Sequence, residues 1–485
     1  MMFFPSRKVF LSIGSVSIRW YAILILAGIV VAYILSKKDA KKFKYLDHED
    51  YLDDFIFLVL WVGILGARIW FCLFFNFDYY FHNPIEILKI YDGGLAIQGG
   101  VMAGIIAGYF FCKKRHTSFM KTLDCVLPNV LIAQAFGRWG NFANQECHGP
   151  AVPEAYFDKF PTFIKEGMFI GGEYYMPMFL YESIACLIGF VFIRYLVKRF
   201  GQRKRGDLAW CYLMWYGIVR LYIESLRTDA LMIGSLKIAQ IISVIFVVLG
   251  VLGYMGVFEK LFKPEKPTII LDFDGTLVDT DASILGAFEE LYRLHDDVKN
   301  FTEEKRDYVL GPALRESFPV LFPGLDVDML IDEYHDAQEK LLHLNKPAPN
   351  AEKVLKTLKD EGYNIGILST RTKDGIELRL DKLNLSQYID GIYGLNEVVN
   401  LKPDPEGVFG LIKDYKWNKD DVIYVGDSLG DVGAGYNYGA YTVAYISRES
   451  RRKELEESNA NVCIDNFDQL LDIVKEKHYF TYNLK

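Results

Sequence analysis

The spacing of hydrophobic residues differs between the two halves of this chain. Up to about residue 257 they form long apolar runs separated by short polar blocks, whereas from residue 268 onward short apolar runs alternate with charged segments. A helix that crosses the hydrocarbon core of a bilayer needs about 20 mainly apolar residues. Seven segments qualify, near residues 16–35, 54–75, 94–112, 122–142, 177–197, 207–226 and 236–257. The pattern predicts a seven-helix membrane domain over 1–257, a linker over 258–267 and a soluble α/β domain over 268–485.

Basic residues give the predicted membrane domain a direction. They gather in three blocks, at residues 37–44, 113–121 and 198–205, which follow the first, third and fifth apolar segments. Short loops rich in lysine and arginine stay on the cytoplasmic side of a membrane. The charge pattern therefore predicts a multi-pass protein of the cell membrane, with its N-terminus outside and its soluble domain in the cytoplasm.

Composition argues against a nucleic acid partner and against metal-bound or disulfide-bonded cysteines. The 485 residues include 54 lysines and arginines and 62 aspartates and glutamates, and acidic residues dominate the soluble part, which argues against a nucleic acid partner. The seven cysteines show no CxxC spacing, so we expect buried thiols rather than metal sites or disulfides. The first apolar run lacks a small-residue cleavage pattern and is expected to remain as a membrane helix.

Polar residues interrupt the apolar segments at their predicted outer ends. The stretch QAFGRWGNFANQE (134–146) carries an arginine, two asparagines and a glutamate. An arginine deep in a membrane helix costs about 2.5 to 3.5 kcal/mol, so it normally faces a partner or a wet cavity. Similar groups recur in other segments: Tyr21, Gln98 within DGGLAIQGG (92–100), FLYE (179–182), and Tyr216, Arg220 and Glu224 at four-residue spacing. Such groups can simply hold helices together, but this many at one depth favour a functional cavity.

These segments resemble the phosphatidylglycerol–prolipoprotein diacylglyceryl transferases. The resemblance rests on WYA (20–22), DGGLAIQGG, GRWGNFANQE, PMFLYES (177–183) and YGIVRLYIESLRTD (216–229), in the family's order across most of residues 10–257. It implies transfer of a diacylglyceryl group from phosphatidylglycerol to the lipobox cysteine thiol of a prolipoprotein, with release of glycerol phosphate. It also implies a seven-helix topology, an outer N-terminus and no cofactor.

The resemblance also implies roles for single residues. Negative charge on a leaving phosphate monoester must be held in a site of low dielectric constant, which guanidinium groups do with fixed, bidentate geometry. Arg138 and Arg220 are therefore expected to bind the headgroup and stabilise the leaving group, and Asn141 is a further catalytic candidate that donates to its oxygens. The candidates for substrate binding, among which the glutamates would also orient the arginines, are Tyr21, Asn144, Glu146, Gly149, Tyr216 and Glu224.

One matched position departs from the family. Gln98 stands where the family usually has a histidine, a candidate base for the attacking thiol, and glutamine takes up no proton. Either the base is dispensable, because a thiol of pKa near 8.5 is already a few per cent ionised at neutral pH, or His148 or Glu146 replaces it. A third interpretation is that Gln98 hydrogen-bonds the substrate, and we keep it as a catalytic candidate.

Strand-like runs in the soluble part end in polar residues. They are TIILDFDGTLVDT (268–280), NIGILST (364–370), DVIYVGDSLGD (421–431) and YTVAYIS (441–447), and charged helical segments separate them. This alternation predicts a doubly wound parallel sheet. The carboxyl ends of such strands carry the site in open α/β sheets, and DxDGT places two carboxylates at the end of the first of them.

The soluble part resembles the phosphatase branch of the haloacid dehalogenase superfamily across about 267–475. The matching features are DxDGT at a strand end, Ser369, the lysine of LKPDP (401–405) and GDSLGD. They imply Asp272 as the nucleophile that forms an aspartyl-phosphate and Asp274 as the acid and base. Ser369 and Lys402 would bind a small phosphomonoester. Mg²⁺ would be held by Asp272, the backbone at Asp274, Asp427 and Asp431.

A helical insert is expected between the first two strands, over about 281–350. It resembles the small cap of phosphoglycolate-phosphatase-like members and includes GPALRESF (311–318), whose Arg315 either reaches the substrate or forms a surface salt bridge. The sequence thus predicts a bifunctional transferase and phosphatase. Alternatives are a membrane part that is an inactive anchor or lipid sensor for the phosphatase, or a gene fusion without coupling. A transporter predicts internal repeats or charged midplane pathways, which are not seen. Consumption of the released glycerol phosphate by the phosphatase conflicts with the predicted topology.

Overall fold

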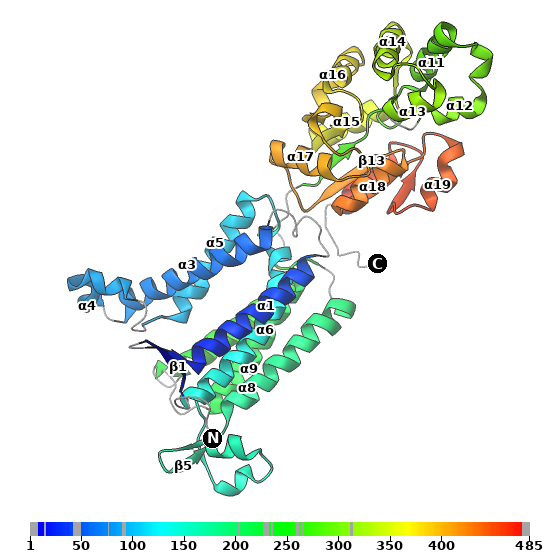
Figure 1. Ribbon diagram of the computed structural model, residues 1–485. Coiled ribbons are helices and arrows are strands. Elements are labelled where there is room, and N and C mark those ends of the chain that lie inside the picture. Colours follow the sequence, from blue (N-terminus) through cyan, green and yellow to red (C-terminus); the bar gives the residue numbers. More distant parts are fainter. Residues whose placement is uncertain are drawn as a thin grey trace. The chain divides into compact units, whose positions relative to one another are not determined.

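The chain forms two compact units, which divide at residues 264 and 265. The computed structural model describes residues 8–13, 16–41, 50–75, 77–89, 94–201, 204–226, 232–233, 236–258, 261–262, 266–310 and 314–477. The first unit is helical, and the second contains a parallel sheet with helices around it (Figure 1). Half of the predicted linker, residues 259, 260 and 263–265, lies outside the described residues.

Long helices form the first unit. They are α1 (Trp20–Ala40), α3 (Tyr51–Phe74), α5 (Ile97–Lys114), α6 (Phe119–Asn144), α8 (Met178–Val191, continued as a π-helix by Phe192–Gly201), α9 (Asp207–Leu226) and α10 (Ile238–Tyr254). Each overlaps one predicted segment. Within the described residues, α1, α3 and α8 with its continuation are long and apolar enough to cross a membrane, with mean hydropathies of 1.9, 2.2 and 1.7. Helix α10 is a shorter apolar helix of 17 residues.

The first apolar segment starts later as a helix than the sequence suggested. The prediction began near Val16, but Val16–Arg19 form strand β2, which pairs antiparallel with β1 (Val9–Ile13). Helix α1 therefore begins at Trp20. Apolar composition alone does not distinguish a strand from the first turn of a membrane helix, because both hide hydrophobic side chains.

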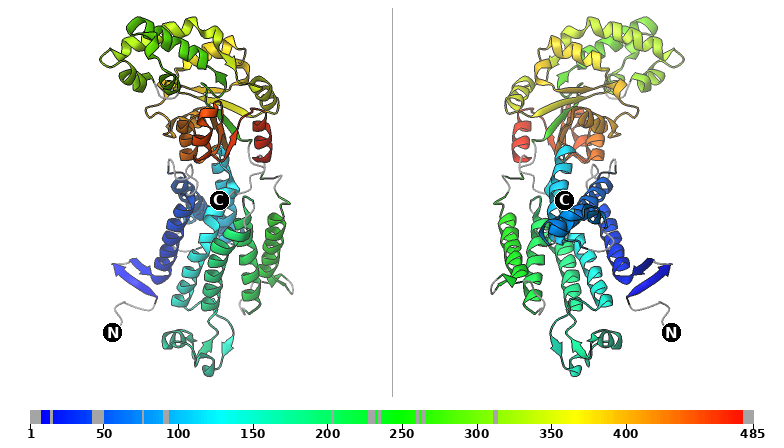
Figure 2. Two further views of the ribbon diagram at one scale, coloured as in Figure 1. Left: turned by 90° about the vertical axis from the view of Figure 1, so that its right-hand side faces the viewer. Right: turned by 90° about the vertical axis from the view of Figure 1, so that its left-hand side faces the viewer.

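Helix α6 is the centre of the first unit, called the membrane unit below, and α1, α8 and α9 all pack against it. Helix α9 also packs on α10, and α3 packs on α5. Figures 1 and 2 show α1, α6, α8 and α9 side by side. Small residues allow this close approach: a Cβ at Gly28 would lie 2.9 Å from the Ala133 backbone, and one at Gly217 would lie 2.8 Å from the Ser243 carbonyl oxygen.

Charged groups join three helices at the end of the bundle away from Arg138. Lys198 donates to Asp39 over 2.9 Å, and Arg194 contacts both Asp39 and Asn129. Asp39 is buried, so its charge needs these partners. The cluster fixes α1, α6 and the π-helical continuation of α8 relative to one another.

A small folded segment between α6 and α8 was not predicted from the sequence. Strands β3 (Ala151–Val152), β5 (Glu173–Tyr175) and β4 (Phe169–Ile170) form an antiparallel sheet in this order. Helix α7 (Thr162–Gly167) packs with them around a core of Phe157, Ile164, Met168 and Phe179. The strands are only two or three residues long, too short to give a clear alternating pattern.

The second unit is built on a six-stranded sheet in which every pairing is parallel. Its order is β12 (Gly391–Tyr393), β11 (Asn364–Leu368), β8 (Thr268–Leu271), β13 (Val422–Gly426), β14 (Tyr441–Tyr445) and β15 (Val462–Ile464). The four predicted strands are present, and β12 and β15 are additional.

Helices cover both faces of this sheet, as the alternation of side chains along a strand requires. Ile365 and Ile367 of β11 share a core with α15 (Ala351–Asp360), α16 (Lys373–Lys382) and α20 (Gln469–Lys477). On the other face, a Cβ at Gly366 would meet Trp417 and Leu411 of α17 (Glu406–Tyr415) and its following loop. This is the predicted doubly wound arrangement, and it leaves the strand ends free for a site.

A helical insert leaves the sheet between β9 (Val278–Asp279) and β10 (Lys346–Pro347), which pair antiparallel at its base. The insert consists of α11 (Asp281–His295), α12 (Glu303–Tyr308), α13 (Leu314–Leu321) and α14 (Val327–Lys340). It has its own core, which includes Phe288, Tyr292, Phe318 and Tyr334. Residues 311–313 of the predicted GPALRESF stretch lie outside the described residues.

Candidate functional sites

Two arginines from different helices share one carboxylate in the membrane unit. The Arg138 guanidinium on α6 lies 2.6 Å from Glu182 Oε1 on α8, and Arg220 on α9 lies 4.0 Å from the same oxygen. The Glu182 residue is only 6 % exposed. Because α6 runs antiparallel to α8 and α9 returns to the same end, residues 138, 182 and 220 meet although they are far apart in the sequence. Glu182 alone offsets one of the two positive charges, and a second carboxylate lies beside Arg220.

A second carboxylate accompanies Arg220. Glu224 Oε2 lies 2.8 Å from Arg220 Nη2, one helical turn away, close enough for an ion pair but without the alignment of a hydrogen bond. The Glu224 side chain is almost fully buried. Tyr216, one turn earlier, stacks on Tyr212. The predicted ladder of Tyr216, Arg220 and Glu224 therefore lies on one face of α9.

The amides after Arg138 form a chain of hydrogen bonds. Arg138 Nη1 donates to Asn141 Oδ1 over a long 3.4 Å, and Asn141 Nδ2 donates to Glu146 Oε1 over 3.0 Å. Asn144 Nδ2 donates to the same glutamate oxygen over 3.2 Å. Gln145, in the left-handed conformation at the end of α6, turns the chain so that Glu146 points back. Glu146 thus orients Arg138 through Asn141 and not by direct contact.

Tyr21 joins this group from α1. Its ring packs on Gly140, where an added Cβ would lie 2.7 Å from the Tyr21 ring. Only a glycine allows that approach without displacing the ring. This contact explains in physical terms why the arginine stretch contains a glycine two residues after Arg138.

Other predicted residues of this site make no direct contact with the arginines among the described residues. Gln98 lies on α5 with its side chain exposed, and no hydrogen bond joins it to Arg138 or Arg220 in this part of the chain. Gly149 is buried against Met176 and Met178, so its role in the structure is packing. His148 stacks on Tyr175 and hydrogen-bonds the Gly149 carbonyl. Asp92 and Gly93 of DGGLAIQGG lie outside the described residues.

Sequence reasoning missed Glu182 as a site residue. Its stretch, FLYE, stood out only as a polar end of an apolar segment. The available signal was an acidic residue in the first turns of a helix that is otherwise apolar, where a charge needs a partner. The partner itself, Arg138, is 44 residues earlier, so the pairing becomes visible only in the folded chain.

Three aspartates meet at the carboxyl ends of the strands in the second unit. Asp272 follows β8, Asp427 follows β13 and Asp431 lies in the first turn of α18 (Leu429–Tyr438). One oxygen from each of the three lies within 4.8 Å of the others. All three are buried. Because β8 and β13 are neighbouring parallel strands, these residues come to one edge of the sheet, as predicted.

Lys402 is the cation of this cluster. Its Nζ donates to Asp272 Oδ1 over 2.5 Å and to Asp431 Oδ1 over 2.7 Å. Ser428 and Asp431 cap the start of α18 reciprocally, which fixes the Asp431 carboxylate. Gly275 has a φ of +80°, and a Cβ there would lie 2.4 Å from Asp427. The turn after β8 therefore depends on glycine for both backbone and space.

The electrostatics of the cluster suit a divalent cation. Burial, together with the charge of Asp431, raises the pKa of Asp427 to about 6. Burial and both neighbouring carboxylates, against the effect of Lys402, raise the pKa of Asp272 well above its ordinary value. Three carboxylates thus face one ammonium, and oxygen ligands of this kind are what Mg²⁺ prefers. The residues present fit the metal that the sequence implied.

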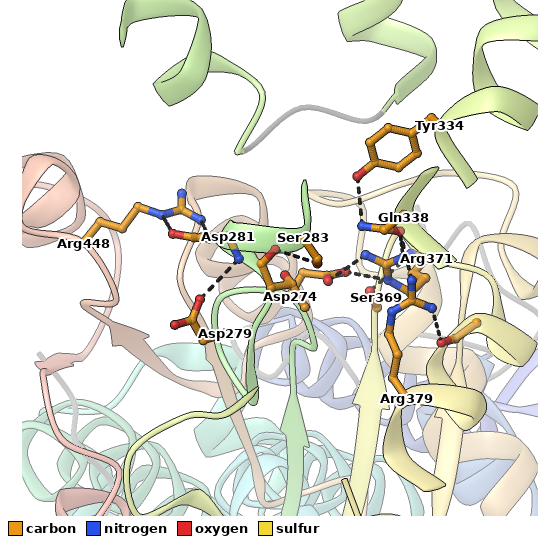
Figure 3. Close-up of polar contacts among 12 residues, drawn as sticks. Asp274, Asp279, Asp281, Ser283, Tyr334, Gln338, Ser369, Arg371, Arg379 and Arg448 are labelled. Atoms are coloured by element: carbon orange, nitrogen blue, oxygen red, sulfur yellow. Dashed lines mark hydrogen bonds and ion pairs between the residues drawn. The ribbon is translucent and has the colours of Figure 1, made fainter. Parts of the chain in front are cut away.

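Asp274 is engaged differently from these three aspartates. Arg371, two residues after Ser369 at the end of β11, donates from Nε and Nη2 to the two Asp274 oxygens over 3.0 and 2.8 Å (Figure 3). Burial opposes ionisation, but the charge and hydrogen bonds of Arg371 outweigh it and lower the pKa of Asp274. Ser369 is buried and accepts a hydrogen bond from the Arg371 backbone. Arg371 is another site residue that the sequence analysis did not name.

Arg315 lies on the surface of the helical insert. It pairs with Asp328 over 2.7 Å, and the two side chains are 68 % and 75 % exposed. The structure therefore does not bring Arg315 to the aspartates, and of the two interpretations it shows the surface salt bridge. Nothing in the pattern of GPALRESF distinguishes a residue that faces the sheet from one that faces water.

Known proteins match the two units separately. Residues 8–255, just over half of the chain, match the family of prolipoprotein diacylglyceryl transferases. The chain belongs to this family. Among its relatives is the phosphatidylglycerol–prolipoprotein diacylglyceryl transferase of Streptococcus sanguinis, 44 % identical over 48 % of this chain and 89 % of the relative. The enzyme of the same name from Staphylococcus aureus is 42 % identical over 48 % of this chain and 82 % of the relative.

The second unit of this diacylglyceryl transferase matches another family. Residues 269–445 match haloacid dehalogenase-like hydrolases. A haloacid dehalogenase-like hydrolase structure from Bacteroides fragilis is 26 % identical, with a TM-score of 0.40, and covers 42 % of this chain and 100 % of its own. The matches to the two families make the protein an enzyme with a transferase part and a hydrolase part, which the sequence had indicated.

Proposed function

We propose that the membrane unit transfers the diacylglyceryl group of phosphatidylglycerol to the lipobox cysteine thiol of prolipoproteins. Both relatives named above carry this activity in their names. The observation that carries the proposal for this chain is the sharing of Glu182 by Arg138 and Arg220. A buried carboxylate holds two guanidinium groups at one place, and a phosphodiester is a ligand that such a pair binds well.

The arginines act on the leaving group in this reaction. The cysteine sulfur forms a bond to the terminal glyceryl carbon, and the bond from that carbon to the phosphate oxygen breaks. The departing glycerol phosphate keeps the electron pair and gains negative charge. Arg138 and Arg220 stabilise that charge in a site of low dielectric constant. Asn141 and Asn144 donate to the same oxygens, and Tyr21 and Tyr216 line the headgroup pocket.

The nucleophile comes from the substrate, so the chain needs no catalytic cysteine. The thiol loses its proton to solvent water before it attacks, because Gln98 cannot accept a proton. A free thiol is already a few per cent ionised at neutral pH. We propose that Gln98 hydrogen-bonds the substrate, and that the reaction proceeds without a dedicated base.

The test is transfer itself. Purified full-length protein is incubated with phosphatidylglycerol and a lipobox-cysteine peptide, and the two products are quantified. Lipidated peptide and glycerol phosphate are expected to form in equal amounts. Arg138→Ala is expected to abolish transfer, whereas Arg115→Ala, at the exposed pair with Asp54, is expected to retain it. No transfer by well-folded wild-type protein would contradict the proposal and leave the membrane unit as an anchor or lipid sensor for the hydrolase.

We further propose a seven-span topology with the N-terminus outside and the second unit in the cytoplasm. The supporting observation is the placement of lysine and arginine after the first, third and fifth helices. In sealed vesicles, a protease is expected to reach the second unit only when the cytoplasmic face is exposed. Cleavage from the opposite face would overturn this orientation.

For the second unit we propose a Mg²⁺-dependent phosphatase that acts on a small phosphomonoester through an aspartyl-phosphate. The supporting observation is the cluster of Asp272, Asp427 and Asp431 beside Lys402. Asp272 attacks the phosphorus, the ester oxygen leaves with a proton from Asp274, and Asp274 then takes a proton from the attacking water. Lys402 and Ser369 hold the phosphoryl oxygens.

Asp272, Asp427 and Asp431, with the backbone at Asp274, would hold Mg²⁺. The metal supplies charge that lets an anionic carboxylate approach an anionic phosphate. The helical insert forms the cap that closes over the substrate. Release of phosphate from p-nitrophenyl phosphate is expected to need Mg²⁺ and to vanish in Asp272→Asn, whereas Asp468→Asn, at the surface, retains it. Metal-independent release, or release by Asp272→Asn, would contradict the proposal.

A further inference from the structure

A buried arginine beside the phosphatase site has no carboxylate partner. Arg379 on α16 is 7 % exposed, and its hydrogen bonds within the described residues go to neutral oxygens, those of the Gly375 carbonyl and the Gln338 side chain. Its Nε–H is buried with no acceptor in this part of the chain. Buried charges in proteins are normally paired, because an unpaired one loses its hydration without compensation. Arg379 therefore keeps an unmet need for an anion.

Arg371 lies next to it and also has donors to spare. Gln338 Oε1 accepts from both arginines, over 2.7 Å from Arg371 Nη1 and 2.9 Å from Arg379 Nη2 (Figure 3). A guanidinium has five N–H donors. The described hydrogen bonds of Arg371 use three of them, two to Asp274 and one to Gln338, and those of Arg379 use two. Five donors remain on two adjacent cations.

The charge balance points the same way. Asp274 is the one carboxylate in contact with either arginine among the described residues, so the pair retains a net positive charge. Burial and the proximity of Arg371 lower the pKa of Arg379 to about 10, which still leaves it charged at neutral pH. The helical insert covers this pair, since Gln338 is fully buried and donates to Tyr334, both on α14. Two cations are thus enclosed between the insert and the sheet, beside the residues that act on the phosphoryl group.

We propose that Arg371 and Arg379 form a second anion-binding subsite, which makes the second unit selective for phosphomonoesters that carry another anionic group, a carboxylate or a phosphate. This inference rests on the proposed phosphatase function and goes beyond it by naming the substrate class. The phosphoryl group occupies the side of Ser369 and Lys402, and the second anion binds the free donors of the two arginines. Glycerol phosphate has no second anion, so the inference also argues against it as the preferred substrate.

The test compares three substrates with full-length protein: glycerol 3-phosphate, 3-phosphoglycerate, which has a carboxylate in place of one hydroxymethyl group, and glycerol 1,3-bisphosphate. We expect kcat/KM for at least one anionic substrate to exceed that for glycerol 3-phosphate at least about tenfold. Preference for one of the two identifies the group that the subsite takes. Equal kcat/KM for all three would overturn the inference.

Variants of Arg379 test whether this residue causes the preference for substrates with a second anionic group. Arg379→Met keeps the length of the side chain and removes its charge, and it is expected to cut the ratio of kcat/KM between anionic and neutral substrates at least about tenfold. Because it replaces an unpaired buried charge, it should unfold at the same or a higher temperature than wild type. Arg379→Lys keeps the charge and should lose less of the preference. A preference that survives Arg379→Met would overturn the inference. Arg293→Met, at an exposed pair with Glu290, is the matched control.

A binding measurement separates this inference from the phosphatase proposal. In Asp272→Asn, which lacks the nucleophile, calorimetry is expected to show 3-phosphoglycerate or the bisphosphate binding at least about tenfold more tightly than glycerol 3-phosphate. Charge-selective binding without hydrolysis of any phosphomonoester by the wild type would leave the subsite standing and the phosphatase proposal wrong. Hydrolysis without charge-selective binding would support the phosphatase proposal and show that the subsite inference is wrong.

Discussion

The carboxylate of Glu182 lies 2.6 Å from the guanidinium of Arg138, and this ion pair joins α8 to α6 at the centre of the proposed transferase site. The Arg138 side chain keeps part of its surface exposed while Glu182 is buried, so the carboxylate acts as the fixed partner and the guanidinium can also reach a substrate. In the proposed reaction, the position of the Arg138 guanidinium relative to the leaving group therefore depends on Glu182.

Replacement of this carboxylate by its neutral isostere is expected to disable transfer. Glu182→Gln keeps the shape but removes the carboxylate that holds Arg138 over 2.6 Å and lies 4.0 Å from Arg220. Misplacement of such a guanidinium by about 1 Å typically costs about 100-fold in rate. The loss should appear in diacylglyceryl transfer to a lipobox peptide. Glu154→Gln, at an exposed pair with Lys165, is the control and should transfer normally. Normal activity in Glu182→Gln would show that the arginines do not need this anchor.

Two glycines of α6 provide a matched pair for testing Tyr21. In Gly140→Ala the new Cβ would lie 2.7 Å from the Tyr21 ring and displace it, whereas at Gly137 the nearest atom, in Ile25, is 3.9 Å away. Alanine favours a helix over glycine by about 1 kcal/mol, so a loss of activity would not come from the helix itself. We expect transfer to fall about tenfold or more in Gly140→Ala and to persist in Gly137→Ala. Equal activities would contradict a role for the Tyr21 position.

The aspartate cluster predicts a dependence of stability on pH and on Mg²⁺. The pKa of Asp427 rises from 3.8 to about 6 on folding, so the folded state binds this proton more tightly than the unfolded chain does. Without Mg²⁺, the stability that Asp427 contributes is therefore full below pH 3.8 and lost as the pH rises through about 6. Asp427→Asn removes the free-energy cost of ionising this buried carboxyl, so the variant should unfold at a higher temperature than wild type at pH 7.5.

Calorimetry with and without Mg²⁺ checks this prediction. Mg²⁺ should raise the unfolding temperature of the wild type and have little effect on Asp427→Asn, because a ligand stabilises only the state that binds it. Asp468→Asn, at a surface pair with Lys353, should behave as the wild type. A lower unfolding temperature for Asp427→Asn than for wild type in the absence of metal would contradict the prediction. It would show that other groups of the protein stabilise the ionised Asp427 carboxylate without Mg²⁺.

Arg371 should set the pH at which Asp274 acts as an acid. The guanidinium lowers the pKa of Asp274, so Arg371→Met, which leaves the burial in place, is expected to raise it. The protonated acid then persists to higher pH, and the falling limb of kcat/KM for an alkyl phosphate should move upward. With p-nitrophenyl phosphate, whose leaving group needs little protonation, the limb should move less. An unchanged profile for both substrates would contradict the assignment of Asp274 as the acid.

The sequence by itself determined the division of the chain and the kinds of element in each part. Seven apolar segments, the stretch around Arg138 and the aspartates at strand ends are local patterns, and each predicted the correct kind of element because the periods of helices and strands are properties of the backbone. The aspartate cluster was predictable as a set, since neighbouring parallel strands bring their ends to one edge.

Only the tertiary structure decided which charges meet. The partnership of Glu182 with Arg138, the pairing of Asp274 with Arg371 and the unpaired Arg379 join residues that lie far apart in the sequence. It also placed Arg315 in a surface salt bridge with Asp328, one of the two interpretations that the sequence had left open. Burial and the distance between charges decide whether an ionisable group is a partner, a ligand or a solvated surface residue, and both quantities exist only once the chain has folded.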